Sequence, residues 1–157
     1  MIGQVRWAIK TSFREYLDAL EDNATTVESG ASLDEGGRIV LPVTTVSATT
    51  PPLELHCGGS VLLTAYRGVL AVRLRDVRVR IDGAGAGALS AMHPGSPRPT
   101  DVRADVVSFE SVRIDGDVIT ATAPQLTEEG VRMLGDVYAV GAVVDPIEIH
   151  LPDITSI

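Results

Sequence analysis

Apolar side chains recur at helical spacing near the start of the chain. They stand three or four positions apart, at Val5, Ile9, Phe13, Leu17 and Leu20. Charged residues occupy several of the positions between them, as on the outward face of an amphipathic helix. The pattern predicts a helix that starts around Val5 and ends near Leu20, where the polar residues 21–23 interrupt it.

The middle of the chain has the pattern of antiparallel strands. From residue 25 to residue 81, short runs rich in Val, Thr, Ile and Leu alternate with turn signals at residues 34–37, 50–52 and 58–59. Within residues 70–81 the apolar positions change parity, and one strand cannot keep a single buried face through such a change. A bulge or bend is therefore expected at Arg75 and Asp76.

The next part of the chain predicts a loop and two further strands. Residues 82–100 are rich in Gly, Ala and Pro, which predicts a mobile loop around a short strand at residues 88–91. Residues 101–109 and 112–121 have the composition of strands, and the second of them contains a turn signal at residues 115–117.

The end of the chain predicts a second helix and a closing strand. Thr127, followed by two glutamates, is typical of a helix start, and this helix is expected to reach about Tyr138. Ile147 and Ile149 alternate with polar residues and predict the last strand. The expected fold is therefore mainly β, an antiparallel β-sandwich-like domain with an N-terminal amphipathic helix and a second short helix near the C-terminus. The length fits one domain over residues 1–157.

Composition and charge exclude several classes of protein. A formal net charge of −8 makes nucleic-acid binding unfavourable, because phosphate contacts need clustered cations. The single Cys57 excludes an intrachain disulfide. No apolar run has the length of a membrane span, and residues 1–10 lack a signal-peptide pattern, so a cytoplasmic location is expected for the chain as given. A chain trimmed of a leader would look the same.

The sequence contains no motif for the common hydrolytic or metal chemistries. It has no nucleophile elbow, phosphate-binding loop or HExxH motif. His56 and Cys57 are neighbours on a predicted strand and point to opposite faces, which argues against a zinc site. His93, in the predicted loop, and His150, on the last strand, are the other two histidines that can approach a site.

Several runs of this sequence resemble the HtaA-type haem-binding domain of actinobacterial haem uptake. A Trp-x-Ile-Lys-x-Ser-Phe-Arg-x-Tyr run is matched by Trp7, Ile9, Lys10, Ser12, Phe13, Arg14 and Tyr16. The closing segment of the family is matched by residues 126–130, 138–141 and 145–147. The resemblance covers about residues 4 to 150.

This resemblance implies a domain that binds one ferric haem partly through its first helix. It implies that Tyr16 is the axial iron ligand and that Ser12 contacts a propionate. Ser12 and Tyr16 are four positions apart and share a helix face, beside Ile9 and Phe13, which are expected to supply apolar surface for the porphyrin. Tyr138, in the closing segment, is the remaining expected haem-site residue.

One position departs from the family pattern. The family has a His that bonds the ligand Tyr, and its position falls on Tyr66. A Tyr cannot take up a proton between about pH 5 and 8 as a His does. Tyr66 can instead donate a hydrogen bond to the Tyr16 oxygen, approach the other face of a ligand, or fill the pocket of a domain without haem.

Three functions are therefore compatible with the sequence. The first is a haem-binding protein of the transport or storage type, with a Tyr-ligated ferric haem. The second is an intracellular enzyme, biosynthetic for example, that uses the cavity for an organic substrate or uses Tyr-ligated haem as a catalyst. The third is a structural or partner-binding domain without a small ligand, in which Tyr16 and Tyr66 pack on each other in a collapsed pocket. The partner is haem or another hydrophobic small molecule, and a homodimer is compatible with the sequence.

Overall fold

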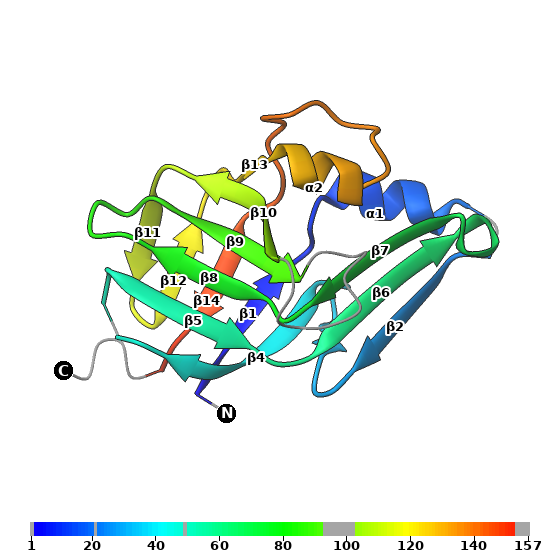
Figure 1. Cartoon of the computed structure of the whole chain (residues 1–157). Helices are drawn as coiled ribbons and strands as arrows, with labels where there is room; N and C mark the ends of the chain where they lie inside the picture. The colour runs from blue at the N-terminus through cyan, green and yellow to red at the C-terminus, as the bar shows by residue number, and fades with distance from the viewer. Residues whose placement is uncertain (1, 21, 49, 93–102, 153–157) are drawn as a thin grey trace.

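The computed structural model describes residues 2–20, 22–48, 50–92 and 103–152. These residues form two antiparallel sheets with two short helices beside them (Figure 1). The helices are α1 (Thr11–Asp18) and α2 (Glu128–Met133), and a 3-10 turn, η1, covers Tyr66–Gly68. The expected mainly β fold with two helices is confirmed.

The larger sheet curls along its length, and the smaller one extends from its side (Figure 1). In spatial order the larger sheet contains β11 (Val112–Asp115), β12 (Val118–Ala121), β14 (Ile147–His150), β1 (Gly3–Trp7), β4 (Ile39–Val46), β5 (Leu53–Cys57), β8 (Arg78–Ile81), β9 (Gly87–Met92), β10 (Arg103–Phe109) and β13 (Gln125–Leu126), with β3 (Ser32–Leu33) paired to β4. The smaller sheet contains β2 (Ala24–Glu28), β6 (Ser60–Ala65) and β7 (Leu70–Arg75).

The first element is a strand followed by a helix, so the prediction of one helix from Val5 was wrong. Val5 pairs with Leu41 of β4 on one side and with Ile149 of β14 on the other. Apolar residues at positions 5, 7 and 9 fit alternation in a strand as well as helical spacing. The long-range pairing decided between the two, and Ile9, with φ 69°, turns the chain from β1 towards α1.

The bend expected at Arg75 and Asp76 is confirmed, and it joins the two sheets. The strand β7 before it belongs to the smaller sheet, and β8 after it belongs to the larger one. Asp76 has φ 51°, and its carboxylate accepts a hydrogen bond from Arg103 Nη1 at 2.9 Å. The parity change is possible because each sheet has its own buried face.

The second helix is shorter than predicted. Thr127 caps it as expected, because its hydroxyl accepts the backbone N–H of Gly130 at 3.1 Å. The helix ends at Met133, and Gly135, with φ 81°, reverses the chain before Tyr138 is reached. The predicted strands on both sides of the loop are present as β9 and β10, whereas residues 93–100 of that loop, and its expected mobility, lie outside the described residues.

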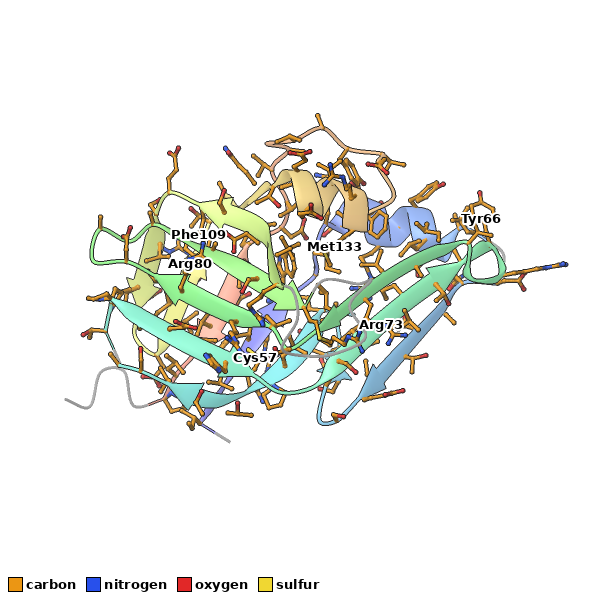
Figure 2. The ribbon with its side chains drawn as sticks, viewed as in Figure 1. Cys57, Tyr66, Arg73, Arg80, Phe109 and Met133 are labelled. Carbon is orange, nitrogen blue, oxygen red and sulfur yellow. The ribbon has the colours of Figure 1, made fainter. Side chains whose placement is uncertain are left out.

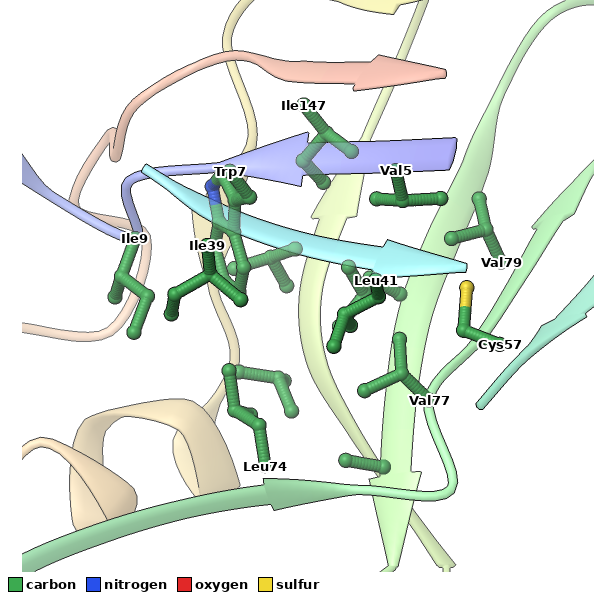
Figure 3. Packing of buried hydrophobic residues seen from close by; sticks show 14 of the residues in the cluster. Val5, Trp7, Ile9, Ile39, Leu41, Cys57, Leu74, Val77, Val79 and Ile147 are labelled. Atoms are coloured by element: carbon green, nitrogen blue, oxygen red, sulfur yellow. The ribbon is translucent and has the colours of Figure 1, made fainter. Parts of the chain in front are cut away.

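The core is aliphatic and continuous from the larger sheet to α1. Figure 3 shows the side chains of Val5, Trp7, Leu41 and Ile147 packed together between neighbouring strands. From α1, Phe13 and Leu17 enter the same cluster at 0% and 4% exposure. Burying these two side chains anchors α1 on the core, so its opposite face is held outward in a defined orientation. None of the described helices is long or apolar enough to cross a membrane.

Candidate functional site

The helix α1 presents the two residues that the motif singled out. Ser12 and Tyr16 lie one turn apart on its outward face, and Tyr16 is 44% exposed. Ile9 and Phe13, which were expected to present apolar surface to a porphyrin, are only 2% and 0% exposed. Ile9 precedes the helix altogether, because α1 begins at Thr11. These two residues therefore support the site from inside and offer no surface to a ligand in this conformation.

A carboxylate far along the chain holds the start of α1 in place. Asp145 accepts the backbone N–H of Thr11 at 3.0 Å and also bonds the Thr11 hydroxyl. The backbone of Asp145 accepts the Trp7 indole N–H at 2.9 Å and donates to the carbonyl of Ile9 at 2.9 Å. A negative charge at this position also suits the positive end of the helix dipole. The opening motif and the closing segment are thus joined at Asp145.

We expect Asp145→Ala to lower the free energy of unfolding by about 1–2 kcal/mol, the usual range for the loss of a helix cap. The matched control is Asp18→Ala, which removes an exposed carboxylate at the other end of α1. The control should stay within about 0.5 kcal/mol of the wild type. Urea unfolding measures both, and equal stabilities of the two variants would show that Asp145 does not hold the helix.

Tyr138 lies at the N-terminal end of α1 and links Ser12 to the core. The two hydroxyl oxygens of Ser12 and Tyr138 are 3.4 Å apart, and either can donate. The Tyr138 ring meets the buried Phe13 ring edge-on, with centroids 6.2 Å apart. The Lys10 ammonium lies 5.5 Å from the centre of the Tyr138 ring and donates to the carbonyl of Val143 at 3.0 Å. The segment that carries Tyr138 returns from α2 above the helices (Figure 1).

Tyr66 lies near the other end of the same helix face. It stands at the tip of the β6–β7 hairpin, beyond the C-terminal end of α1 (Figure 2). Tyr66 and the next residue, Arg67, both have left-handed backbone conformations, with φ 53° and 57°. Such conformations are uncommon for bulky residues and are found at functional sites. Tyr66 is 50% exposed, so neither it nor Tyr16 is collapsed into the core.

The phenol of Tyr66 acts on that of Tyr16. Hydrogen bonding to Tyr66, the charge interaction with it and partial burial, in this order, raise the pKa of Tyr16 above its ordinary value. A raised pKa means that these surroundings favour the protonated phenol of Tyr16. The residue at the position where the family has a His therefore lies next to the expected iron ligand.

Replacing Tyr66 by phenylalanine is expected to lower the pKa of Tyr16 towards the ordinary value of about 10. The interaction with Tyr66 stabilises the folded protein while Tyr16 is protonated. Its contribution to the free energy of unfolding is present below about pH 10 and is lost as the pH rises through the raised pKa of Tyr16. NMR of ring-labelled tyrosine follows the titration of each phenol. Tyr138→Phe is the control and should leave Tyr16 unchanged. If the pKa of Tyr16 is the same in Tyr66→Phe as in the wild type, Tyr66 does not cause the raised pKa.

An open pocket of about 420 Å³ continues the site past the end of α1. Its volume is within the range of small-molecule sites. It is lined by Ala19, Leu20, Asp22, Tyr66 and Arg67. Exposed apolar side chains lie on the segments that carry Tyr66 and Tyr138, at Val69, Val137 and Val140. The site therefore combines an accessible phenol with apolar surface at both ends of the helix.

The histidines do not join this site where the structure describes them. His56 on β5 has its Nε2 atom 3.1 Å from Glu54 Oε1. His150 pairs with Gln4, at the end of β1 away from α1. His93 lies outside the described residues. No group of three potential metal-binding side chains occurs within residues 2–20, 22–48, 50–92 and 103–152. Burial raises the pKa of the Cys57 thiol to about 12.

Comparisons with known proteins agree with this arrangement. The HtaA family model, described as Htaa, matches residues 2–150. No curated protein matches the chain at a significant score. The C-terminal domain of HtaA from Corynebacterium glutamicum is similar in structure, with a TM-score of 0.71, 19% identity, and coverage of 94% of this chain and 93% of that one.

Two further structures from the same organism show the same fold. The haem-binding protein HtaB from Corynebacterium glutamicum has a TM-score of 0.68 and 18% identity, covering 94% of this chain and 91% of its own. A domain-swapped dimer of a His-to-Ala variant of the HtaA C-terminal domain has a TM-score of 0.63 and 19% identity, and coverage is 88% of each chain. The fold and the joined motifs are those of an HtaA-type domain over residues 2–150. The chain belongs to the HtaA family.

Sequence reasoning missed two residues of the site. Lys10 was part of the matched motif but was not assigned to the site, although it is the only lysine in the chain. Asp145 entered the sequence analysis only as part of the matched closing segment, and its contact with Thr11 spans 134 positions. A carboxylate directly before a proline carries no local sign that it caps a helix so far away.

Proposed function

We propose that this protein binds ferric haem, with the phenolate of Tyr16 as the iron ligand, and serves haem transport or storage. The observation that carries the proposal is the position of Tyr16, half-exposed on a helix that is anchored to the core, with a second phenol close enough to raise its pKa. Membership of the HtaA family and similarity to a protein named for haem binding support the ligand.

The chemistry of the donor set suits this ligand. Ferric iron is a hard cation, and Tyr is one of the axial ligands that proteins use for haem. Tyr16 must lose its proton to bind the metal. The phenol of Tyr66 lies close enough to act on Tyr16, so its hydroxyl can then donate to the new phenolate, while the proton of Tyr16 passes to solvent. The same pair of oxygens would thus hold the proton before binding and stabilise the anion afterwards.

The segments that carry Tyr66 and Tyr138 offer apolar surface suited to a flat, largely apolar group. Val69, Val137 and Val140 are exposed on these segments. Ser12 keeps the role that the family resemblance implies, next to a propionate, and Tyr138 supports it through the contact of their hydroxyls. Ile9 and Phe13 act from the core, by fixing the orientation of α1.

Titration of the purified protein with hemin tests the proposal. We expect a saturable shift of the Soret band at one equivalent, and metal-free protoporphyrin IX should bind more weakly because it lacks the bond to Tyr16. Absence of a saturable shift would overturn the proposal. Equal affinity for the two porphyrins would show that no residue of the protein, Tyr16 included, binds the iron. The enzymatic alternative and a homodimer stay predictions. Sedimentation of the haem-free and hemin-loaded protein would test the homodimer.

A further inference from the structure

The only lysine and all three tyrosines of the chain belong to this one site. Lys10 directly precedes α1, and its ammonium is held by the carbonyl of Val143 and the ring of Tyr138. Tyr138 in turn contacts Ser12. The N-terminal end of the site therefore has a positive charge held close to two hydroxyl groups.

Among the residues that the structure describes, no carboxylate forms an ion pair with Lys10, and the nearby Asp145 carboxylate binds Thr11 instead. An ammonium has three N–H donors, and one bond, to Val143, is present at 3.0 Å. By contrast, Arg38 and Arg80 are each paired with a carboxylate within 3 Å. At the opposite end of the site, Arg67 is 91% exposed and its charge is offset by Asp22 at 3.7 Å. Within the described part of the chain, the cation at the N-terminal end is therefore free of an ion pair, whereas the cation at the other end is in one.

The net charge of the whole chain makes an unpaired cation important for binding an anionic ligand. At −8, the protein repels an anionic ligand at long range, so binding of an anion needs a local cation. Lys10 provides one beside Ser12, and the pocket lined by Ala19 and Leu20 lies at the other end, where the cation is already paired. A ligand with a carboxylate at one end and an apolar body gains most in a single orientation.

We propose that Lys10 is the residue that orients the ligand, by pairing with its carboxylate at the N-terminal end of α1. The apolar end of the ligand then points towards Tyr66 and the pocket beyond α1. The inference rests on the proposed function, and it names the ligand class more narrowly as a planar, amphiphilic carboxylate. The cation–π contact with Tyr138 holds the ammonium near the site before the ligand arrives, which lowers the entropic cost of the pairing.

Esterification of the ligand provides the test. Hemin and hemin dimethyl ester share the iron and the ring, but the ester lacks the carboxylates. We expect Lys10→Met to weaken hemin binding about tenfold, which corresponds to about 1.4 kcal/mol, and to leave the affinity for the ester unchanged. Lys10→Arg should recover most of the loss. Arg113→Met, the matched removal of an exposed cation on β11, outside the site, should change either affinity by less than about twofold.

The outcomes separate this inference from the function on which it rests. Equal weakening of both ligands by Lys10→Met would show a structural role for Lys10 and overturn the inference, as would no weakening of either. If the wild type binds neither ligand, the proposed function itself fails. If it binds both with equal affinity and Lys10→Met changes nothing, haem binding stands and the orienting role of Lys10 does not.

A measurement on the wild type keeps the test independent of variant folding. Reductive methylation with a carbon-13 reagent keeps the charge and labels the only lysine of the chain. Gallium protoporphyrin IX, a diamagnetic analogue of hemin, should shift the single lysine signal, whereas its dimethyl ester should not. A signal that is unmoved by the free acid, under conditions where absorbance shows saturation, would overturn the pairing.

Discussion

Replacing Tyr16 by phenylalanine is expected to weaken hemin binding by more than about 100-fold. Loss of a residue that only supports a metal ligand typically costs about 10- to 100-fold in affinity, and loss of the ligand itself costs more. The substitution removes one oxygen from an exposed helix face, so the fold should stay intact. Soret titration gives the affinity, and resonance Raman spectra of the wild type should contain tyrosinate modes that the variant lacks.

Tyr66→Phe is the control, because it deletes the same atom from the neighbouring phenol. We expect it to weaken binding by no more than about 10- to 100-fold and to keep the tyrosinate modes. If Tyr66→Phe abolishes them while Tyr16→Phe binds normally, the ligand is Tyr66. Because Tyr16 has to release a proton whose pKa is raised, hemin affinity of the wild type should increase with pH up to that pKa.

Replacing Phe13 by alanine is expected to lower the free energy of unfolding by about 3–5 kcal/mol, as for other fully buried aromatic residues. Phe13 has no exposed surface, and its ring supports that of Tyr138 at 6.2 Å. A domain with a total stability of about 5–15 kcal/mol loses a large part of it through such a change. Denaturant unfolding measures the loss, and hemin titration of the folded fraction shows whether the site survives.

Phe13→Leu is the matched variant, because it keeps most of the apolar volume. Its cost should be about 1.5 kcal/mol or less, and hemin binding should be retained within a few fold. A loss below about 1 kcal/mol in Phe13→Ala would contradict anchoring of α1 by this ring. Normal stability of Phe13→Leu with lost hemin binding would instead place Phe13 in contact with the ligand.

Local patterns in the sequence were sufficient for much of the fold. Thr127 followed by glutamates predicted a helix start, and the hydroxyl of Thr127 caps α2 as expected. The parity change after Arg75 predicted a bend, and Asp76 has the conformation of one. These features depend on near neighbours in the chain. The prediction of a helix from Val5 failed because strand pairing with Leu41 and Ile149 outweighs local helical spacing.

Only part of the site was predictable from the sequence. Ser12 and Tyr16 came from the family resemblance together with their spacing on one helix face, and the structure keeps both on the outward face of α1. Phe13 was assigned to the ligand surface, but its ring packs into the core. An apolar residue on a helix next to a ligand has the same pattern as one that faces a core, so spacing alone cannot separate them.

By itself, the sequence determined the fold family, the strand-rich architecture and the helix that carries Tyr16. Only the tertiary structure decided which faces of that helix are buried, that Asp145 caps it and that Lys10 and Tyr138 meet at its N-terminal end. The physical reason is the range of the interactions. Propensity and local caps such as Thr127 act over a few residues. The contacts of Asp145, Lys10 and Tyr138 at the start of this helix instead join segments more than 120 positions apart, as the Ser12 and Tyr138 hydroxyls do across 126.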